Sequence, residues 1–89
     1  MQFDRRAIGF FKLFESDLSF NGSETVKNID VSSRLNDARK TIRQLLDVTN
    51  NYENIFCKIE ATSASNIRIT TGVPLPSGTY RLEVFQNNS

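Results

Sequence analysis

Cys57 is the strongest nucleophile in this sequence, but the residues that would activate it are absent. The chain has one cysteine and no histidine, and histidine is the commonest general base near neutral pH and the commonest metal ligand. The composition therefore excludes Cys-His and Ser-His-Asp catalysis and histidine-ligated metal sites. Cys57 alternates in phase with Ile55 and Ile59, which predicts a small core residue in place of a reactive thiol.

Paired carboxylates are the second kind of side chain that could do chemistry. Glu15 with Asp17, and Glu60 with Glu83, are the candidate pairs for general acid-base work. The latter two glutamates lie close in sequence to cations, which favours cross-strand charge pairs over catalysis. The chain's 4 glycines do not lead directly into the predicted helix, so a phosphate-binding loop is excluded. We expect no enzymatic activity, no cofactor and no metal.

Basic residues gather in one segment. Arg39 and Arg43 are four residues apart and Lys40 lies beside the first, so on a helix they form one basic surface that could contact a polyanion. The formal net charge is only +1, whereas domains that hold nucleic acid usually carry a large basic excess. The three side chains are kept as a candidate polyanion contact, with an ordinary solvated face as the favoured interpretation.

These side chains need elements to position them, and the clearest predicted element is a helix over residues 33–49. Its apolar residues recur with a period close to 3.6, at Leu35, Ala38, Ile42, Leu45 and Leu46. Ser32 or Ser33 can cap its first turn. Asn50 and Asn51 are suited to ending it, because asparagine tolerates the left-handed conformation.

Strands are predicted on both sides of this helix. Residues 54–62, 66–71 and 79–86 alternate in polarity, with a hairpin turn at 63–65 and a longer loop, stiffened by two prolines, at 72–78. Residues 7–20 and 25–31 are expected to form an antiparallel hairpin around Asn21-Gly22. A helix over 3–14 is the alternative for the first of these, and Gly9 argues against it.

The fold that follows is a single α+β domain over residues 1–89. We expect a two-layer sandwich in which an antiparallel sheet of about five strands carries one helix on one face, in the order β-β-α-β-β-β. Such a layering leaves the second face of the sheet without a covering element.

Aromatic residues are expected on that uncovered face. In the predicted alternation Phe56 and Phe85 point away from the helix, and Phe11 can join them. Several apolar side chains on one face mark an interaction surface. Leu75, between two prolines, is either a second contact or folded back onto the core. These four residues form the predicted protein interface.

The sequence thus favours a non-enzymatic structural or assembly protein that acts through protein-protein contacts. Its partners would be copies of itself or other subunits, as in the head or tail of a bacteriophage virion. One alternative is a small inhibitory or adaptor protein that binds a host enzyme, and a second is a nucleic-acid-binding module. No small-molecule substrate and no membrane partner are expected. The lone cysteine and the lack of a signal-peptide pattern favour the cytoplasm or a virion over secretion.

Overall fold

β-strands form nearly all the regular structure of residues 10–87, the part of the chain that the computed structural model describes. The elements, in chain order, are β1 (Phe10–Phe20), β2 (Val26–Asp30), η2 (Ala38–Lys40), β3 (Thr41–Asp47), η3 (Val48–Asn50), β4 (Glu53–Ile55), β5 (Lys58–Ser63), β6 (Asn66–Thr70) and β7 (Gly78–Asn87). The two elements labelled η are single turns of 3₁₀-helix, three residues each.

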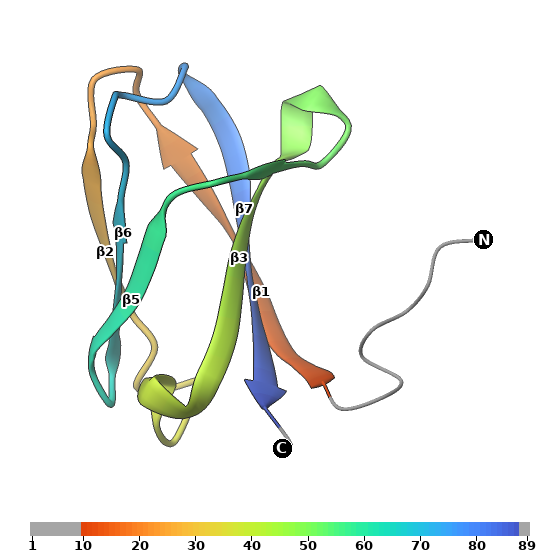
Figure 1. The fold of residues 1–89 in the computed structure, drawn as a ribbon, viewed down its shortest axis with the longest axis vertical. Coiled ribbons are helices and arrows are strands. Elements are labelled where there is room, and N and C mark those ends of the chain that lie inside the picture. The colour runs from red at the N-terminus through yellow and green to blue at the C-terminus, as the bar shows by residue number, and fades with distance from the viewer. Residues whose placement is uncertain (1–9, 88–89) are drawn as a thin grey trace.

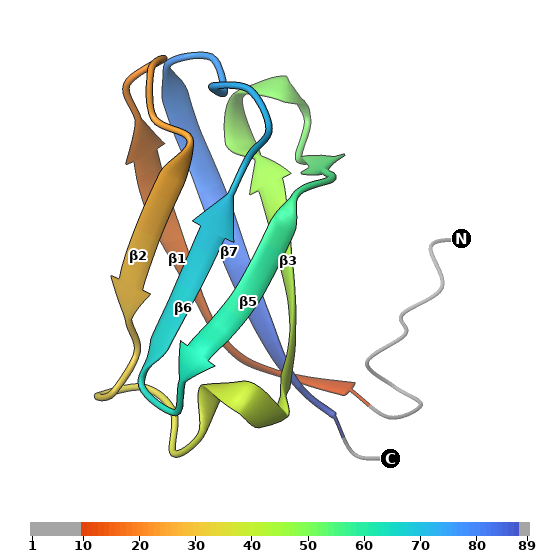
Figure 2. The ribbon, with the colours of Figure 1, turned by 60° about the vertical axis from the view of Figure 1, so that its left-hand side comes forward.

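The strands form two antiparallel sheets that face each other (Figures 1 and 2). One sheet has four strands in the order β1-β7-β3-β4, and the other has three in the order β2-β6-β5. The predicted α+β fold is therefore wrong, because within the described residues no α-helix covers a sheet. The second sheet occupies the place expected for the helix.

The predicted helix over 33–49 is replaced by a loop and a strand. The backbone amides of Arg34 and Leu35 both donate to the carbonyl of Val31 at 2.9 Å, which holds the loop, and η2 then leads into β3. All seven residues of β3 pair with β7. A gain of ladder hydrogen bonds and two-sided packing outweighs a weak local helix preference.

The predicted hairpin of residues 7–20 with 25–31 is also wrong. The turn itself exists, since Gly22 has a φ of 91° and Asn21 Oδ1 accepts from the amide of Ser23 at 2.9 Å. However, this turn carries the chain from one sheet to the other, so β1 pairs with β7 and β2 pairs with β6. Residues 10–14 are strand, and residues 3–9 of the alternative helix lie outside the described part.

The predicted strand over 54–62 is split in two. β4 ends at Ile55 in the four-stranded sheet, and β5 begins at Lys58 in the three-stranded sheet. Phe56 and Cys57 make the crossing between the sheets. The strands predicted at 66–71 and 79–86 are confirmed as β6 and β7, and the turn after Ser63 joins β5 to β6 as expected.

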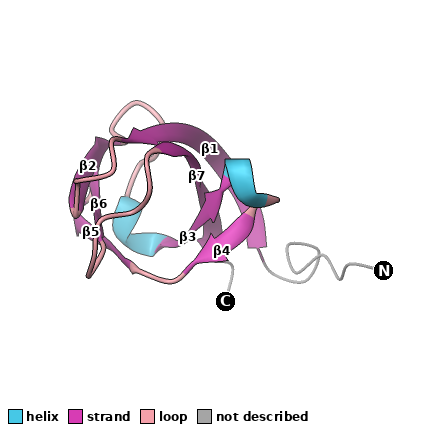
Figure 3. Cartoon of the chain, turned by 90° about the horizontal axis from the view of Figure 1, so that it is seen from above, coloured by secondary structure: helices cyan, strands magenta, loops and turns pink. Residues whose placement is uncertain are grey.

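The core lies between the two sheets, as the view along the strands shows (Figure 3). The ring of Phe20 meets that of Tyr80 edge-on, with centroids 5.1 Å apart, and the Tyr80 hydroxyl donates to the carbonyl of Pro76 at 2.7 Å. The fully buried aliphatic side chains come from both sheets and the loops between them: Val31, Ala38, Leu45, Ile67, Ile69, Leu82 and Val84.

Candidate functional site

Phe56 is the most exposed large apolar side chain of the described residues, at 94%. Its two neighbours explain this position, because Ile55 and Cys57 both pack against the core. Successive side chains of an extended segment point in opposite directions, so Phe56 has to point outward. Phe56 lies in the segment that connects the two sheets, so within the described residues it has no paired strand beside it whose side chains could cover the ring.

Three further apolar side chains are exposed at the same end of the sandwich, and one of them, Val26, lies on β2, the edge strand across the sheet from β5. Tyr52 directly precedes β4 and Val73 lies in the loop from β6 to β7. Lys58 at the start of β5 pairs with Thr70 at the end of β6, so the segments that carry Phe56 and Val73 both leave the three-stranded sheet at this end. We name Tyr52, Phe56 and Val73 the crossover patch.

The backbone around the crossover patch is firmly held. The amide of Tyr52 donates to the carbonyl of Asp47 at 2.9 Å, and the Arg81 guanidinium lies 5.3 Å from the centre of the Tyr52 ring. Leu75 packs against the core. Of the two alternatives for Leu75, the structure therefore shows the one in which the side chain folds back onto the core. In this position Leu75 anchors the loop that carries Val73.

Phe85 and Phe11 do not join this patch. Phe85 lies on the outer face of the four-stranded sheet, as the alternation predicted, but it is only 9% exposed, so its predicted accessibility is wrong. It pairs with Ile42 and Lys12, near the start of β3, whereas Phe56 follows the far end of β3. The backbone of Phe11 pairs with Gln86, and its side chain lies outside the described part. The single aromatic face depended on one continuous sheet, and the crossing at residues 56–57 removes it.

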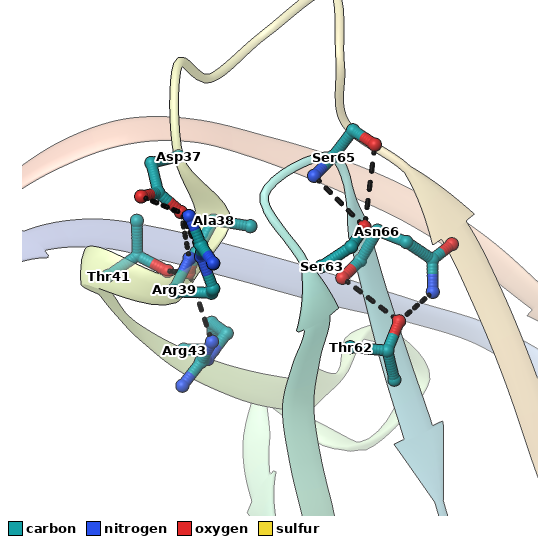
Figure 4. A network of polar contacts seen from close by, with 9 residues as sticks. All are labelled: Asp37, Ala38, Arg39, Thr41, Arg43, Thr62, Ser63, Ser65 and Asn66. Atoms are coloured by element: carbon teal, nitrogen blue, oxygen red, sulfur yellow. Dashed lines mark hydrogen bonds and ion pairs between the residues drawn. The ribbon is translucent and has the colours of Figure 1, made fainter.

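Two of the three residues of the predicted basic surface are engaged by neighbouring groups (Figure 4). Arg39 makes two side-chain hydrogen bonds to Asp37, at 2.9 and 3.1 Å. Arg43 is half-buried and donates to the carbonyl of Ala38 at 3.1 Å, and its burial lowers the pKa of the guanidinium. Lys40 is exposed. Arg39 and Arg43, the other two residues of the predicted polyanion contact, therefore already bind groups of the protein itself.

Three of the four candidate catalytic carboxylates lie in ion pairs on the four-stranded sheet. Arg81 Nε is 2.8 Å from Asp17 Oδ1, and this hydrogen bond lowers the pKa of the Asp17 carboxyl. The hydrogen bond from Lys12 likewise lowers the pKa of Glu15. Glu83 also pairs with Lys12, at 3.0 Å. Charged carboxylates with lowered pKa values are poor proton donors near neutral pH.

Glu60 and Glu83 do not form a pair, because they lie in different sheets. Glu60 instead lies 3.7 Å from Lys58 on its own strand. Cys57 is half-buried, and this burial raises the pKa of its thiol. Burial therefore disfavours the reactive thiolate, which agrees with the prediction that Cys57 is a core residue.

Comparisons with protein-family models, with curated proteins and with solved structures find no match for this chain. Over the described residues, no helix is long and apolar enough to cross a membrane. In the same part of the chain, no three histidine, cysteine, aspartate or glutamate residues gather where they could hold a metal ion.

Proposed function

We propose that this domain is a non-enzymatic interaction module that binds another protein through the crossover patch, with Phe56 as the anchor. The observation that carries the proposal is the 94% exposure of Phe56 on a backbone whose two adjoining residues are fixed in the core. The partner is a second copy of this chain or another subunit of an assembly, in the cytoplasm or a virion.

The energetic argument rests on burial and on preorganisation. Burying an exposed phenylalanine side chain contributes about 2 kcal/mol through the removal of apolar surface from water. Part of such a gain is normally offset by ordering the side chains and loops that bind. Here Ile55, Cys57 and Leu75 already pack against the core, so the segments that carry Phe56 and Val73 lose little freedom on binding.

Polyanion binding through Arg39, Lys40 and Arg43 has weaker support. A phosphate backbone would have to compete with Asp37 for Arg39 and with the Ala38 carbonyl for Arg43. Contacts of this kind supply affinity by releasing counterions from free cations. We therefore place protein binding ahead of nucleic-acid binding.

Substitution of Phe56 tests the proposal. Phe56→Ser should leave the fold intact, because the ring makes little contact with the core, while Val26→Ser is a control at an exposed residue of the three-stranded sheet. If the partner is a second copy, sedimentation equilibrium should show association of the wild type and of the control. The dissociation constant of Phe56→Ser should rise about 30-fold, the effect of removing a hot spot worth about 2 kcal/mol.

For a different partner, a photocrosslinking phenylalanine analogue at position 56 can trap it in the native host, and the purified partner can then be titrated. The same rise in dissociation constant is expected for Phe56→Ser, with Val26→Ser unchanged. Equal affinity of the wild type and Phe56→Ser for that partner would reject the crossover patch as the interface.

A further inference from the structure

A hollow lies at the opposite end of the sandwich from the crossover patch. It has a volume of about 520 Å³ and opens between the loop of residues 31–37 and the strands β1 and β7. Leu13 lines it from β1 and Gln86 from β7. Small-molecule sites usually have volumes of about 300–1,000 Å³, so the hollow is large enough for a ligand.

The walls of the hollow are held by the fold. The pairing of β1 with β7 shifts register between Lys12 and Phe14, and the extra residue, Leu13, is exposed at this irregularity. The loop is tied by the two hydrogen bonds to the Val31 carbonyl described above. It is tied again by the amide of Ala38, which donates at 2.8 Å to the carbonyl of Ala64 in the turn between β5 and β6.

Two cations in the wall make no direct ion pair with a carboxylate of the described residues, although the charge of Lys40 acts on Asp37. These are Arg34, whose guanidinium lies 4.6 Å from the centre of the Phe14 ring, and Lys40. One carboxylate, Asp37, also lines the hollow, but Arg39 already binds it through two hydrogen bonds. The wall therefore carries two cations and one carboxylate, which leaves it net positive.

The remaining polar groups of the wall are uncharged donors and acceptors. They belong to Ser32, Ser33, Asn36 and Gln86, all of which are exposed. Hydroxyl and amide side chains of this kind can bind ligand hydroxyls, since each group both donates and accepts hydrogen bonds. Arginine and lysine are the usual partners of phosphate oxygens.

We propose that this hollow binds a small phosphate monoester, of the sugar phosphate class. The phosphate would lie against Arg34 and Lys40, and the sugar hydroxyls would meet the serine and amide side chains. A free sugar phosphate fits better than a nucleic-acid backbone, because the net charge of the chain is only +1 and the neighbouring Arg39 and Arg43 are engaged. This proposal extends beyond the protein partners expected from the sequence, and it is independent of Phe56.

Titration of ¹⁵N-labelled protein with ribose 5-phosphate, followed by amide chemical shifts, tests the proposal. We expect saturable shifts confined to residues 32–40 and Gln86, and none with ribose at the same concentrations. Arg34→Gln with Lys40→Gln should weaken binding at least tenfold. Lys40→Gln alone keeps the contact of Arg34 with Phe14 and should weaken it severalfold. Lys58→Gln with Arg68→Gln, two exposed cations of the three-stranded sheet, should have no effect.

Three results would overturn the proposal. The first is a shift pattern with ribose 5-phosphate that does not saturate, or that the control pair of substitutions abolishes equally. The second is binding of ribose as tight as that of ribose 5-phosphate, which would remove the role of the phosphate. The third is tighter binding of an eight-nucleotide single-stranded DNA through Arg34 and Lys40, which would assign the hollow to nucleic acid.

Discussion

Two buried threonines show how the same side chain can have opposite effects on stability. Thr41 and Thr71 are 8% and 6% exposed. The hydroxyl of Thr41 donates to the carbonyl of Ala38 at 2.6 Å, whereas the hydroxyl of Thr71 has no hydrogen-bond partner within the described part of the chain. A buried polar group without a partner has lost its hydration and gained nothing in exchange.

Replacing each threonine by valine should therefore change stability in opposite directions. Thr71→Val removes an unsatisfied hydroxyl and should raise the free energy of unfolding by about 1 kcal/mol. Thr41→Val leaves the Ala38 carbonyl with one donor fewer and should lower it by about 1 kcal/mol. Urea denaturation measures both changes, and each substitution serves as the control for the other. A loss of stability in both variants would show that the Thr71 hydroxyl has a partner.

At the scale of single elements, β3 is the segment whose identity governs the architecture. Ile42 and Leu45 are three residues apart, so they would share one face of a helix but lie on opposite faces of a strand. In β3, Leu45 is fully buried at 0% exposure, while Ile42 is 38% exposed on the outer face of the sheet. The apolar residues match a helical period because they come from two successive segments. Leu35 and Ala38 pack against the core before β3 begins, and Leu45 packs there from β3.

Alanine substitutions at these two positions distinguish the strand from the helix. Leu45→Ala should lower the free energy of unfolding by about 2–5 kcal/mol, because it opens a core cavity. Ile42→Ala should cost less than about 1 kcal/mol. If Leu45→Ala does not fold, Leu45→Val removes less volume and should still lower the free energy of unfolding more than Ile42→Ala does. Equal losses at the two positions would instead favour the helix.

The crossing between β4 and β5 is the second element that shapes function. An unbroken strand over residues 54–62 would have placed Phe56 on a sheet face beside other side chains. The transfer to the other sheet after Ile55 removes those neighbours and leaves the ring exposed. The alternation of Ile55, Cys57 and Ile59 toward the core survives the break, which is why Cys57 could be placed correctly from the sequence.

At the scale of the whole molecule, the fold is closed by strands from the two ends of the described chain. Among the described residues β1 pairs only with β7, from Phe10 opposite Asn87 to Phe20 opposite Gly78. This pairing closes a loop over most of the described chain, and the entropy lost in bringing the two strands together precedes the gain in contacts. Folding is therefore expected to be slow for a chain of this size.

Stopped-flow refolding from urea should show a main phase between about 1 ms and 1 s, as for other sandwiches dominated by non-local pairing. The α+β domain predicted from the sequence has more local contacts and would fold faster. A main phase complete within about 100 μs would contradict the closure of the fold by β1 and β7. Circular dichroism of the refolded protein should show a strand spectrum without the helical minima.

The sequence by itself determined the local features of this protein. Alternation located β6, β7 and the inward position of Cys57, and the Asn-Gly pair located the turn at Asn21-Gly22. Side-chain direction and turn conformation depend on neighbouring residues. Only the tertiary structure decided which strands pair, that residues 41–47 are a strand, that Phe85 is buried and that Phe56 lies exposed between the two sheets' strands β4 and β5. These outcomes depend on contacts between residues far apart in the chain, whose free energy exceeds the small local preferences on which a prediction from sequence is based.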